Sequence, residues 1–292
     1  MKRNVQRIII LLVILLPVVL GIIVMFRNSS NIKTISLQKL AVVRVEGMIE
    51  ESEWYVNQLR SYRRDQSVAG VLLRIDSPGG AVAPSQEIYS EVAAYRTADK
   101  PLVVSMGNMA ASGGYYIASP AEKIFASPGT LTGSIGVIFT IPLYKELTEK
   151  LGIGFRVYKA GEFKDIASPY RNHNEEENQI FQKLLDDTHE QFIQAISAGR
   201  AMETDSVRKV ADGRLFTGKQ ATRRNLVDTL GGYEKALSYL CQKAGLPQNC
   251  KVIEREQRGN SWWQTLTQAA QKEFPALGTI SKPAGLYYLF HP

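Results

Sequence analysis

The sequence predicts an α/β protein built around a largely parallel sheet, and three observations support this. Short runs of aliphatic residues alternate with longer segments of helical apolar spacing, which is typical of βαβ units. Two glycine-rich turns, 77–80 and 107–114, directly follow predicted strands, and open parallel sheets carry their sites at the carboxyl ends of strands. The chain has 292 residues, of which 45% are hydrophobic and 22% charged, so it can bury a large core.

The first segment predicts a membrane anchor at residues 1–27. Lys2, Arg3 and Arg7 precede an apolar run over residues 8–26, about the twenty residues that a helix needs to cross a bilayer. Basic residues before such a run favour a cytoplasmic N-terminus, which would place the remaining chain outside the cytoplasm. A cleaved signal peptide is the alternative, but no A-x-A-like site follows the run.

A polar linker over 28–39 leads into one predicted domain at 40–250. Its strands are expected from their β-branched and apolar runs at 40–45, 71–75, 101–106, 122–126, 134–139 and 154–159. Its helices are expected from apolar spacing at 51–65, 84–97, 174–200 and 232–244, with a short helix beginning at Ser112. The pattern weakens after Cys250, so residues 251–292 are predicted to form a loosely structured tail.

Charge and composition exclude several classes of function. The net charge is +7, from 35 Lys and Arg against 28 Asp and Glu, and the basic residues are scattered rather than gathered into an aromatic-lined groove for nucleic acid. No zinc-ligand spacing and no G-x-G-x-x-G occurs, so no metal or cofactor is expected. Cys241 and Cys250 flank a turn and could form a disulfide in an oxidising compartment.

The segment 109–114, M-A-A-S-G-G, places Ser112 among small residues at a predicted strand-to-helix turn. A nucleophile there would benefit from the free N–H groups of the helix start. The plainer interpretation is a helix cap. Glycines in the turn 77–80 could direct backbone N–H groups at a developing oxyanion, although an ordinary β-turn has the same composition.

A serine nucleophile needs a base, and the sequence leaves the choice open. None of His173, His189 and His291 lies in a small-residue turn. Lysine can act as the base where burial favours its neutral form. Lys164 lies in a predicted loop, where a surface lysine paired with Asp165 is the simpler interpretation.

Four ordered motifs together resemble the signal peptide peptidase A family in its short, single-domain form. They are S-P-G-G at 77–80, M-A-A-S-G-G-Y-Y-I-A at 109–118, T-G-S-I-G-V at 132–137 and K-x-x-x-x-K-D-I-x-S-P at 159–169. The resemblance covers about residues 40–245 and the N-terminal anchor. It implies a crotonase-like fold shared with the Clp peptidase, and a membrane-anchored serine protease with a Ser/Lys dyad.

The resemblance also implies a role for each matching residue. Ser112 would be the nucleophile, Lys164 the general base, and Ser134 the residue that orients Lys164. Gly79 or Gly80, together with Gly113, would form the oxyanion hole. Members of the family are oligomers of the bacterial cytoplasmic membrane whose neighbouring subunits build the binding groove, and their substrates are remnant signal peptides.

Two other functions remain open on the sequence. A crotonase-type enzyme would use the same backbone N–H groups on the thioester of an acyl-CoA, but it would need neither the anchor nor the lysine loop. A catalytically silent scaffold for membrane proteins would need neither Ser112 nor Lys164.

Overall fold

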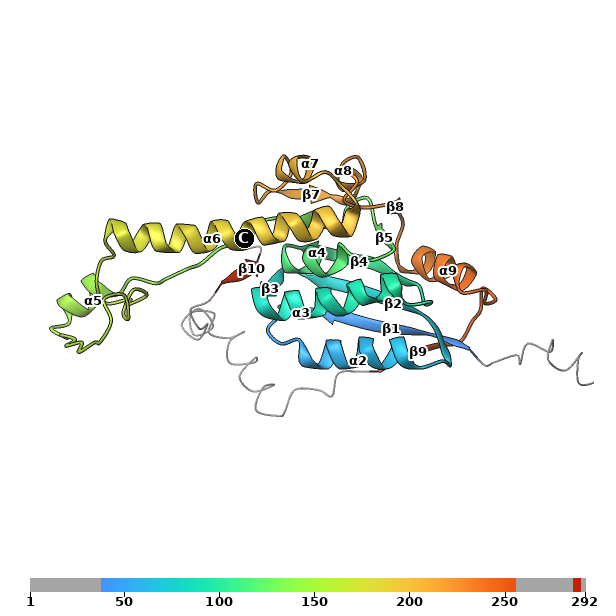
Figure 1. Ribbon diagram of the computed structural model, residues 1–292, viewed down its shortest axis with the longest axis horizontal. Coiled ribbons are helices and arrows are strands. Elements are labelled where there is room, and N and C mark those ends of the chain that lie inside the picture. Colours follow the sequence, from blue (N-terminus) through green and yellow to red (C-terminus); the bar gives the residue numbers. More distant parts are fainter. Residues whose placement is uncertain (1–37, 256–285, 290–292) are drawn as a thin grey trace, which may run out of the picture. The chain divides into compact units, whose positions relative to one another are not determined.

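The computed structural model describes residues 38–255 and 286–289, which belong to one compact unit, Lys39–Pro292. Its strands are β1 (Lys39–Glu46), β2 (Val68–Ser77), β3 (Gly79–Ala81), β4 (Leu102–Ala111), β5 (Lys123–Ala126), β6 (Leu131–Gly133), β7 (Leu215–Thr217), β8 (Thr229–Leu230), β9 (Val252–Glu254) and β10 (Tyr287–Leu289) (Figure 1). Its α-helices are α2 (Glu53–Arg64), α3 (Val82–Ala93), α4 (Gly113–Ala118), α5 (Lys145–Lys150), α6 (Glu175–Arg200), α7 (Thr204–Arg208), α8 (Gly218–Thr222) and α9 (Tyr233–Lys243). A 3₁₀ helix, η1 (Ala94–Thr97), continues α3.

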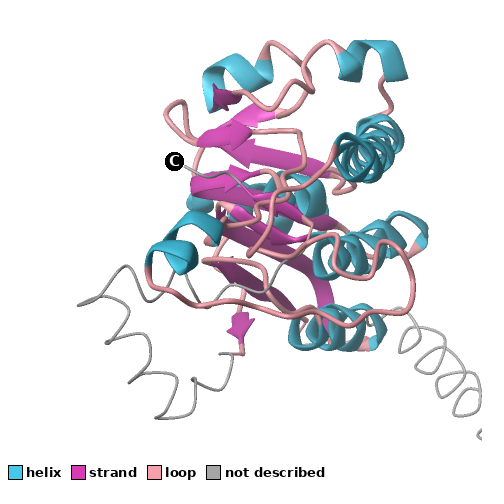
Figure 2. Ribbon diagram, turned by 90° about the vertical axis from the view of Figure 1, so that its left-hand side faces the viewer, coloured by secondary structure: helices cyan, strands magenta, loops and turns pink. Residues whose placement is uncertain are grey.

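The main sheet is almost entirely parallel, which confirms the predicted α/β class. Its strands run in the order β7-β6-β4-β2-β1-β9, and β5 and β8 branch from β4. Every pairing in this sheet is parallel except that of β6 with β7. Figure 2 shows the strands stacked side by side with helices along the sheet. The parallel order brings the carboxyl ends of β2, β4 and β6 to one edge.

The two faces of the sheet bury different sets of side chains. Ala41, Val43 and Val45 of β1 join the larger core cluster, which includes residues of α2, α3, α4 and α6. Leu40 and Val42 of the same strand join a smaller cluster beneath α9. Because successive side chains of a strand point to opposite faces, the continuous apolar run of β1 covers both.

Most of the predicted elements are confirmed within two or three residues, but the strand at 134–139 and the one at 154–159 are wrong. Residues 134–137 form no strand, and only Ile138 makes an isolated bridge, to Tyr287. Residues 153–159 are exposed and irregular, because no neighbouring strand offers them backbone partners in the described residues. The predicted tail also differs, since β9 pairs with β1 and β10 pairs with β3.

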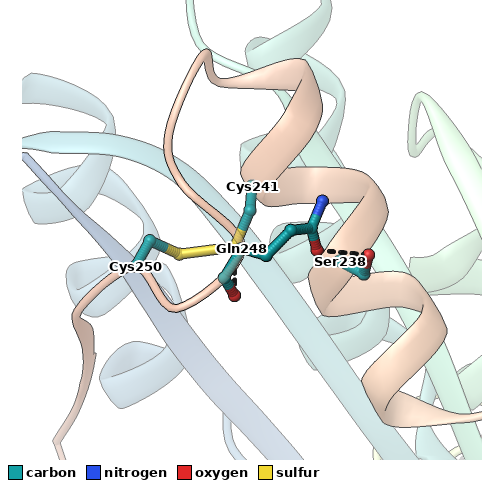
Figure 3. The surroundings of a disulfide bond; sticks show 4 residues. All are labelled: Ser238, Cys241, Gln248 and Cys250. Carbon is teal, nitrogen blue, oxygen red and sulfur yellow. Dashed lines mark hydrogen bonds between the residues drawn. A yellow bond between two sulfur atoms is a disulfide. The ribbon is translucent and has the colours of Figure 1, made fainter.

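The predicted bond between Cys241 and Cys250 is present (Figure 3). Their α-carbons lie 6.5 Å apart, within the range that a disulfide spans. Cys241 is buried on α9, and Cys250 lies just before β9. The bond therefore ties the last helix of the domain to the strand that completes one edge of the sheet.

The predicted membrane anchor lies outside the described residues. Among residues 38–255 and 286–289, no helix combines the length and apolar character that crossing a bilayer requires.

Candidate active site

Ser112 joins the end of β4 to the start of α4 at a sharp turn in the backbone. Its φ is 52°, a left-handed conformation that is uncommon for residues with a side chain. Only 1% of its surface is exposed, and its Oγ has no hydrogen-bond partner among the described residues. Backbone strain and an unpaired buried hydroxyl are both costly, and both recur where a side chain is held for chemistry.

Ser134 lies beside Ser112 because β4 and β6 pair in parallel register. Ala111 is opposite Gly133, and the next residue of each strand is a serine. The Ser112 N–H donates to the Gly133 carbonyl at 2.8 Å. Neighbouring strands lie about 4.8 Å apart, so the two serines are close neighbours. Ser134 also has a positive φ, of 50°, so both residues leave their strands with a φ that is uncommon for residues with a side chain.

The turn after β2 brings two glycines to Ser112. Gly79 has a φ of +104°, and a β-carbon there would lie 2.7 Å from the Gly113 nitrogen and 3.1 Å from the Ser112 β-carbon. A β-carbon on Gly113 would lie 3.1 Å from the Gly80 nitrogen. No residue with a side chain fits at these places, so glycine is required for the two backbone segments to approach. The predicted convergence of Gly79, Gly80 and Gly113 on Ser112 is therefore present.

Hydrogen bonds decide which of the two β3 glycines can act as a donor. The Gly79 N–H is already bonded to Ser77 Oγ at 3.1 Å. Ile49 binds one edge of β3, accepting from Ala81 and donating to the Gly79 carbonyl. Because strand residues alternate in direction, the N–H of Gly80 faces the opposite edge of β3, where Tyr288 of β10 lies opposite it. Of the two β3 glycines, Gly80 is thus the one whose N–H Ser77 does not bind, and its nitrogen lies close to Gly113.

Lys164 lies in a different part of the molecule. It belongs to the arm, which we define as residues 140–173, the segment that contains α5 and leads into α6. In Figure 1, α5 and its loops lie beyond the far end of α6, away from the sheet. Lys164 is exposed, whereas Ser112 is buried and its Oγ has no partner in the described part of the chain. A single copy therefore does not join the predicted nucleophile to the predicted base.

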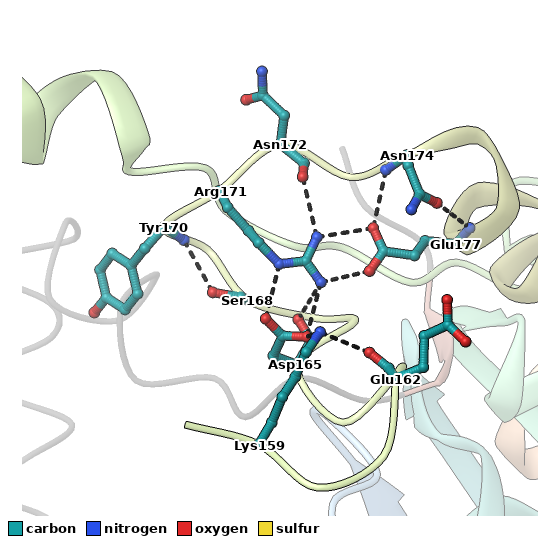
Figure 4. Close-up of polar contacts among 9 residues, drawn as sticks. All are labelled: Lys159, Glu162, Asp165, Ser168, Tyr170, Arg171, Asn172, Asn174 and Glu177. Atoms are coloured by element: carbon teal, nitrogen blue, oxygen red, sulfur yellow. Dashed lines mark hydrogen bonds and ion pairs between the residues drawn. The ribbon is translucent and has the colours of Figure 1, made fainter. Parts of the chain in front are cut away.

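A network of charges holds the stretch around Lys164 to the start of α6 (Figure 4). Arg171 binds both carboxylates that flank it, with Nε 2.9 Å from Asp165 and Nη1 2.9 Å from Glu177. Lys159 also binds Asp165, at 2.6 Å. Asn174 caps α6 and forms a capping box with Glu177. The simple interpretation in which Asp165 pairs with Lys164 is wrong, because Lys159 and Arg171 occupy its oxygens.

These contacts shift the pKa values of the charged groups in the network. Hydrogen bonds from Arg171, and then from Lys159, hold the pKa of the Asp165 carboxyl well below its usual range. Arg171 and then the Asn174 N–H lower the pKa of Glu177 to about 2. Hydrogen bonds to both carboxylates raise the pKa of the Arg171 guanidinium. All three groups are therefore charged at neutral pH.

A cavity of about 560 Å³ opens next to Ser134. Gly136, Asp212, His189 and Leu289 are among the other residues that line it. The buried Nε2 of His189 has no hydrogen-bond partner in the residues described, and the same holds for His173 Nε2. Neither histidine bonds to Ser112 Oγ, so neither of these alternative bases is joined to the nucleophile. The third histidine, His291, lies outside the described residues.

One part of the site has no sequence signal. The backbone carbonyl of Tyr288 lies against both Gly79 and Gly113, where a β-carbon on either glycine would meet it. This contact arises because β10 pairs with β3 across more than 200 residues of chain. Such a short strand in an otherwise weak pattern has no periodicity from which its partner could be predicted.

Comparison with known proteins gives a consistent result. A family model described as peptidase family S49 matches residues 94–247. A protein of Enterococcus faecium that carries the name signal peptide peptidase SppA is 38% identical, over 80% of this chain and 72% of its own length. Serine protease SPPA from Arabidopsis thaliana chloroplasts is 33% identical over 73% of this chain, and protease 4 of Salmonella typhi is 38% identical over 66%. Those two relatives are longer, and the match spans 34% and 31% of them.

Among solved structures, the chain is similar to the ClpP1 N165D mutant from Listeria monocytogenes. That match has a TM-score of 0.45 and 18% sequence identity, and it covers 67% of this chain and 93% of the other.

Proposed function

Because the chain belongs to peptidase family S49 and is a serine peptidase, we propose that it is a membrane-anchored endopeptidase that degrades remnant signal peptides. Ser112 is its nucleophile and Lys164 its general base. The observation that carries the proposal is the turn at Ser112, where a buried hydroxyl that has no partner among the described residues lies beside two convergent backbone amides. The proposal includes the crotonase-like arrangement that the four ordered motifs imply.

The reaction follows from the chemistry of these groups. Neutral Lys164 takes the proton of the Ser112 hydroxyl, and Oγ attacks the carbonyl carbon of a peptide bond. The N–H groups of Gly80 and Gly113 donate to the oxyanion that forms, a role that typically contributes about 3 kcal/mol per donor. The resulting ammonium protonates the leaving amine, and the neutral lysine then activates the water that hydrolyses the acyl-enzyme.

The base reaches the site from a neighbouring copy of the chain. Three features support this part of the proposal. Lys164 is exposed on the arm, whereas Ser112 is buried in the domain. The cavity beside Ser134 offers space through which a side chain of another copy can enter. The arm also exposes large apolar side chains that a subunit contact would cover: Leu143, Leu147, Leu151, Ile153, Phe155, Val157 and Tyr158. A homo-oligomer is therefore the active form.

Ser134 then has the role of a positioning residue. Its place beside Ser112 on the adjacent strand puts its hydroxyl where an incoming ammonium or amine can bind. A lysine with four flexible methylenes needs such an anchor in order to present its lone pair to one atom. The same register that makes the two serines neighbours would thus fix the base relative to the nucleophile.

The substrate class follows from the anchor. An apolar run over residues 8–26, preceded by basic residues, would hold the catalytic domain on the extracytoplasmic side of the bacterial inner membrane. Signal peptides left behind after secretion are apolar segments in that same membrane. Membership of a peptidase family favours this function over the acyl-CoA enzyme and the silent scaffold.

Complementation between two inactive variants tests the proposal. Full-length Ser112→Ala and Lys164→Ala chains, each with a different tag, are purified alone and after co-expression, and hydrolysis of a fluorogenic peptide is measured. Each variant alone should be inactive. The co-expressed pair should recover roughly a quarter of wild-type activity, since half of the serines and half of the lysines are intact and pair at random around a head-to-tail oligomer.

The matched control replaces the Lys164→Ala chain with one that carries both substitutions, and this pair should recover nothing. Full activity of Lys164→Ala alone would remove the lysine from the mechanism. Two inactive variants that do not complement would place the base within the same copy.

A further inference from the structure

Strand β4 contains two extra residues shortly before it reaches the proposed nucleophile. The strands β2 and β4 pair residue by residue as far as Ile75 and Met106. The next pair is Ser77 with Ala110, so β2 advances two residues while β4 advances four. We call residues 107–109 the β4 bulge. Bulges of this kind redirect the chain that follows them, and they recur next to active sites.

Asp76, the residue of β2 that faces the β4 bulge, binds it with both side-chain oxygens. Oδ1 accepts from the Met109 N–H at 3.1 Å, and Oδ2 accepts from the Asn108 side-chain amide at 3.2 Å. Gly107 packs against the same side chain, because a β-carbon there would lie only 2.6 Å from Asp76 Oδ2. The carboxyl group thus supplies the acceptor that a backbone carbonyl would supply in a regular strand pair.

Arg74 binds the residues at which the chain enters the bulge. Its Nη1 donates to the Met106 carbonyl at 2.8 Å and to Ser105 Oγ at 2.9 Å. Arg74 and Asp76 are two residues apart on one strand, so their side chains stand on the same face of the sheet. Arg74 therefore binds an acceptor before the bulge, and Asp76 binds a donor at its end. We call these two residues the clamp.

Two threonines of β6 hold the other edge of the bulge. Thr130 Oγ1 donates to the Gly107 carbonyl at 2.7 Å, and Thr132 Oγ1 donates to the Ala110 carbonyl at 2.6 Å. Both threonines are buried. Side chains from the strands on both sides of β4 therefore determine the shape of the bulge.

The bulge determines where Ser112 stands relative to the glycine turn that follows β2. Because Ala110 pairs with Ser77, Ser112 and Gly79 each come two residues after a matched pair. Two residues of a strand span about 6.6 Å. A register without the two extra residues would keep Ser112 on the same face but move it by about that distance from the glycines. The approach of Gly79 to Ser112 thus depends on the β4 bulge.

We propose that Asp76 and Arg74 are positioning residues for the Ser112 nucleophile and act through the β4 bulge. The inference rests on the proposed peptidase function. Ser112 Oγ has no hydrogen-bond partner in the described part of the chain, so the clamp acts through the backbone of β4 and not by contact with the hydroxyl. Loss of the bond to Met109 lets the bulge relax. A displacement of about 1 Å at a reacting atom can lower the rate of a reaction about 100-fold.

The first experiment removes the carboxyl group of the clamp. In the full-length oligomer, Asp76→Ala should lower kcat on a fluorogenic peptide by roughly 10- to 100-fold. The second-order rate of Ser112 labelling by a fluorophosphonate should fall in the same proportion, because both reactions need a correctly placed hydroxyl. Asp76→Asn should retain both rates within about threefold, since its amide oxygen still accepts from Met109 and the Asn108 amide can rotate to present its oxygen.

Asp228→Ala is the matched control. Asp228 Oδ2 also accepts a strand N–H, that of Ile124 in β5, at 2.7 Å, and the carboxyl pairs with Arg200. The strand β5 pairs with β4 before the bulge, at residues 103–105. The control should lower the melting temperature at least as much as Asp76→Ala, yet keep wild-type kcat and labelling. Equal loss of activity in both variants would mean that Asp76 only supports the fold.

Hydrogen exchange of residues 105–112 shows whether the bulge itself has changed. Exchange should be faster in Asp76→Ala, and it should match wild type in Asp76→Asn and Asp228→Ala. If wild type is labelled and cleaves peptides, and Asp76→Ala does both equally well, the positioning role is overturned and the peptidase function stands. If wild type is neither labelled nor active, the proposed function fails and the positioning role fails with it.

Discussion

Ser112 and Ser134 both have a positive φ, which costs a residue with a side chain about 1–3 kcal/mol. Each follows a strand that the sheet holds in register, so the surrounding structure maintains the strain. The turn tilts Ser112 out of β4 and leaves its N–H bonded to the Gly133 carbonyl, while its Oγ has no partner within the described part of the chain. A glycine at position 112 would adopt the turn more easily, which indicates that the hydroxyl is kept for its chemistry.

Exchange of the base tests the role of lysine itself. Lys164→Arg keeps the positive charge, but a guanidinium has a pKa above about 12 and offers no neutral form to accept a proton. The variant should therefore lose at least about 10³-fold in turnover, as much as Ser112→Ala, and the two changes combined should cost little more. Turnover is measured on a fluorogenic peptide, with Lys159→Arg as the control that changes a neighbouring lysine. Substantial hydrolysis by folded Lys164→Arg protein would mean that only its charge matters.

Sequence motifs predicted the nucleophile and the glycines, but they left two candidates on β3. The choice of Gly80 depends on Ser77 Oγ, which occupies the Gly79 N–H, and on Ile49, which occupies the other edge of the strand. Such competition between hydrogen-bond partners is set by tertiary contacts. The proposed base is a different case, because Lys164 is exposed and Ser112 Oγ has no hydrogen-bond partner among the described residues.

At the scale of the element, the arm depends on Arg171 for its order. The apolar and β-branched residues at 154–159 predicted a strand, yet the segment has no partner strand in the described residues and remains irregular. Phe155 instead stacks on Tyr170, with ring centroids 3.9 Å apart. The long helix α6 was predicted within one residue, because its own capping box and periodicity determine it. Local signals predict helices well, whereas a strand also requires a neighbour.

Loss of the Arg171 network should loosen the arm and leave the domain intact. Arg171→Met removes the bonds to Asp165 and Glu177, so hydrogen exchange of residues 140–173 should become several-fold faster while β1, β2 and β4 keep their protection. Arg208→Met is the control, because it breaks an ion pair with Glu190 on the exposed surface of α6. Equal exchange in wild type and Arg171→Met would show that the arm is ordered by other contacts.

Low pH should loosen the arm, as the Arg171→Met substitution does. A carboxyl whose pKa is lower in the folded protein than in the unfolded chain adds stability above its unfolded value, and that stability is lost as the pH falls towards the folded value. For Glu177 this window runs from about 4.3, the usual value for glutamate, down to about 2. Exchange of the arm in wild type should therefore rise as the pH falls through this window, once corrected for intrinsic exchange rates. In Arg171→Met that rise should be absent.

At the scale of the whole molecule, the last described strand, β10, lies beside the candidate active site. Residues 251–292 were predicted to be a loose tail, but β9 completes one edge of the sheet and β10 lies on the glycines beside Ser112. Both strands have only three residues, too few for an alternating pattern to be recognised. Both strands are stabilised by pairing with β1 and β3, which lie far away in the sequence. The α/β class and the largely parallel sheet followed from the strand pattern, whereas the pairing of β10 with β3 did not.

Removal of β10 should make the enzyme more active. A chain that ends at residue 285 lacks β10, so the edge of β3 beside Ser112 is free for peptides. We expect kcat/KM on a long peptide to rise several-fold with little change in kcat, because competition affects substrate binding rather than the chemical step. Tyr288→Asp is the companion variant, since it keeps the chain length but places a charge in the buried aromatic cluster of Tyr116 and Phe192. Unchanged or lower kcat/KM in both variants would show that β10 supports the site instead of blocking it.

Because β10 is part of the same chain as the strand that it covers, dilution of the protein does not release it. Tethered ligands reach effective concentrations on the order of millimolar, and this value stays constant however little protein is present. Half of the sites turn over only when the free substrate concentration exceeds this effective concentration multiplied by the ratio of the dissociation constant of the substrate to that of β10. On the proposed function, the pairing of β10 with β3 would therefore set a threshold: dilute peptides would not displace the strand, and cleavage would begin where peptides are concentrated, as in a membrane.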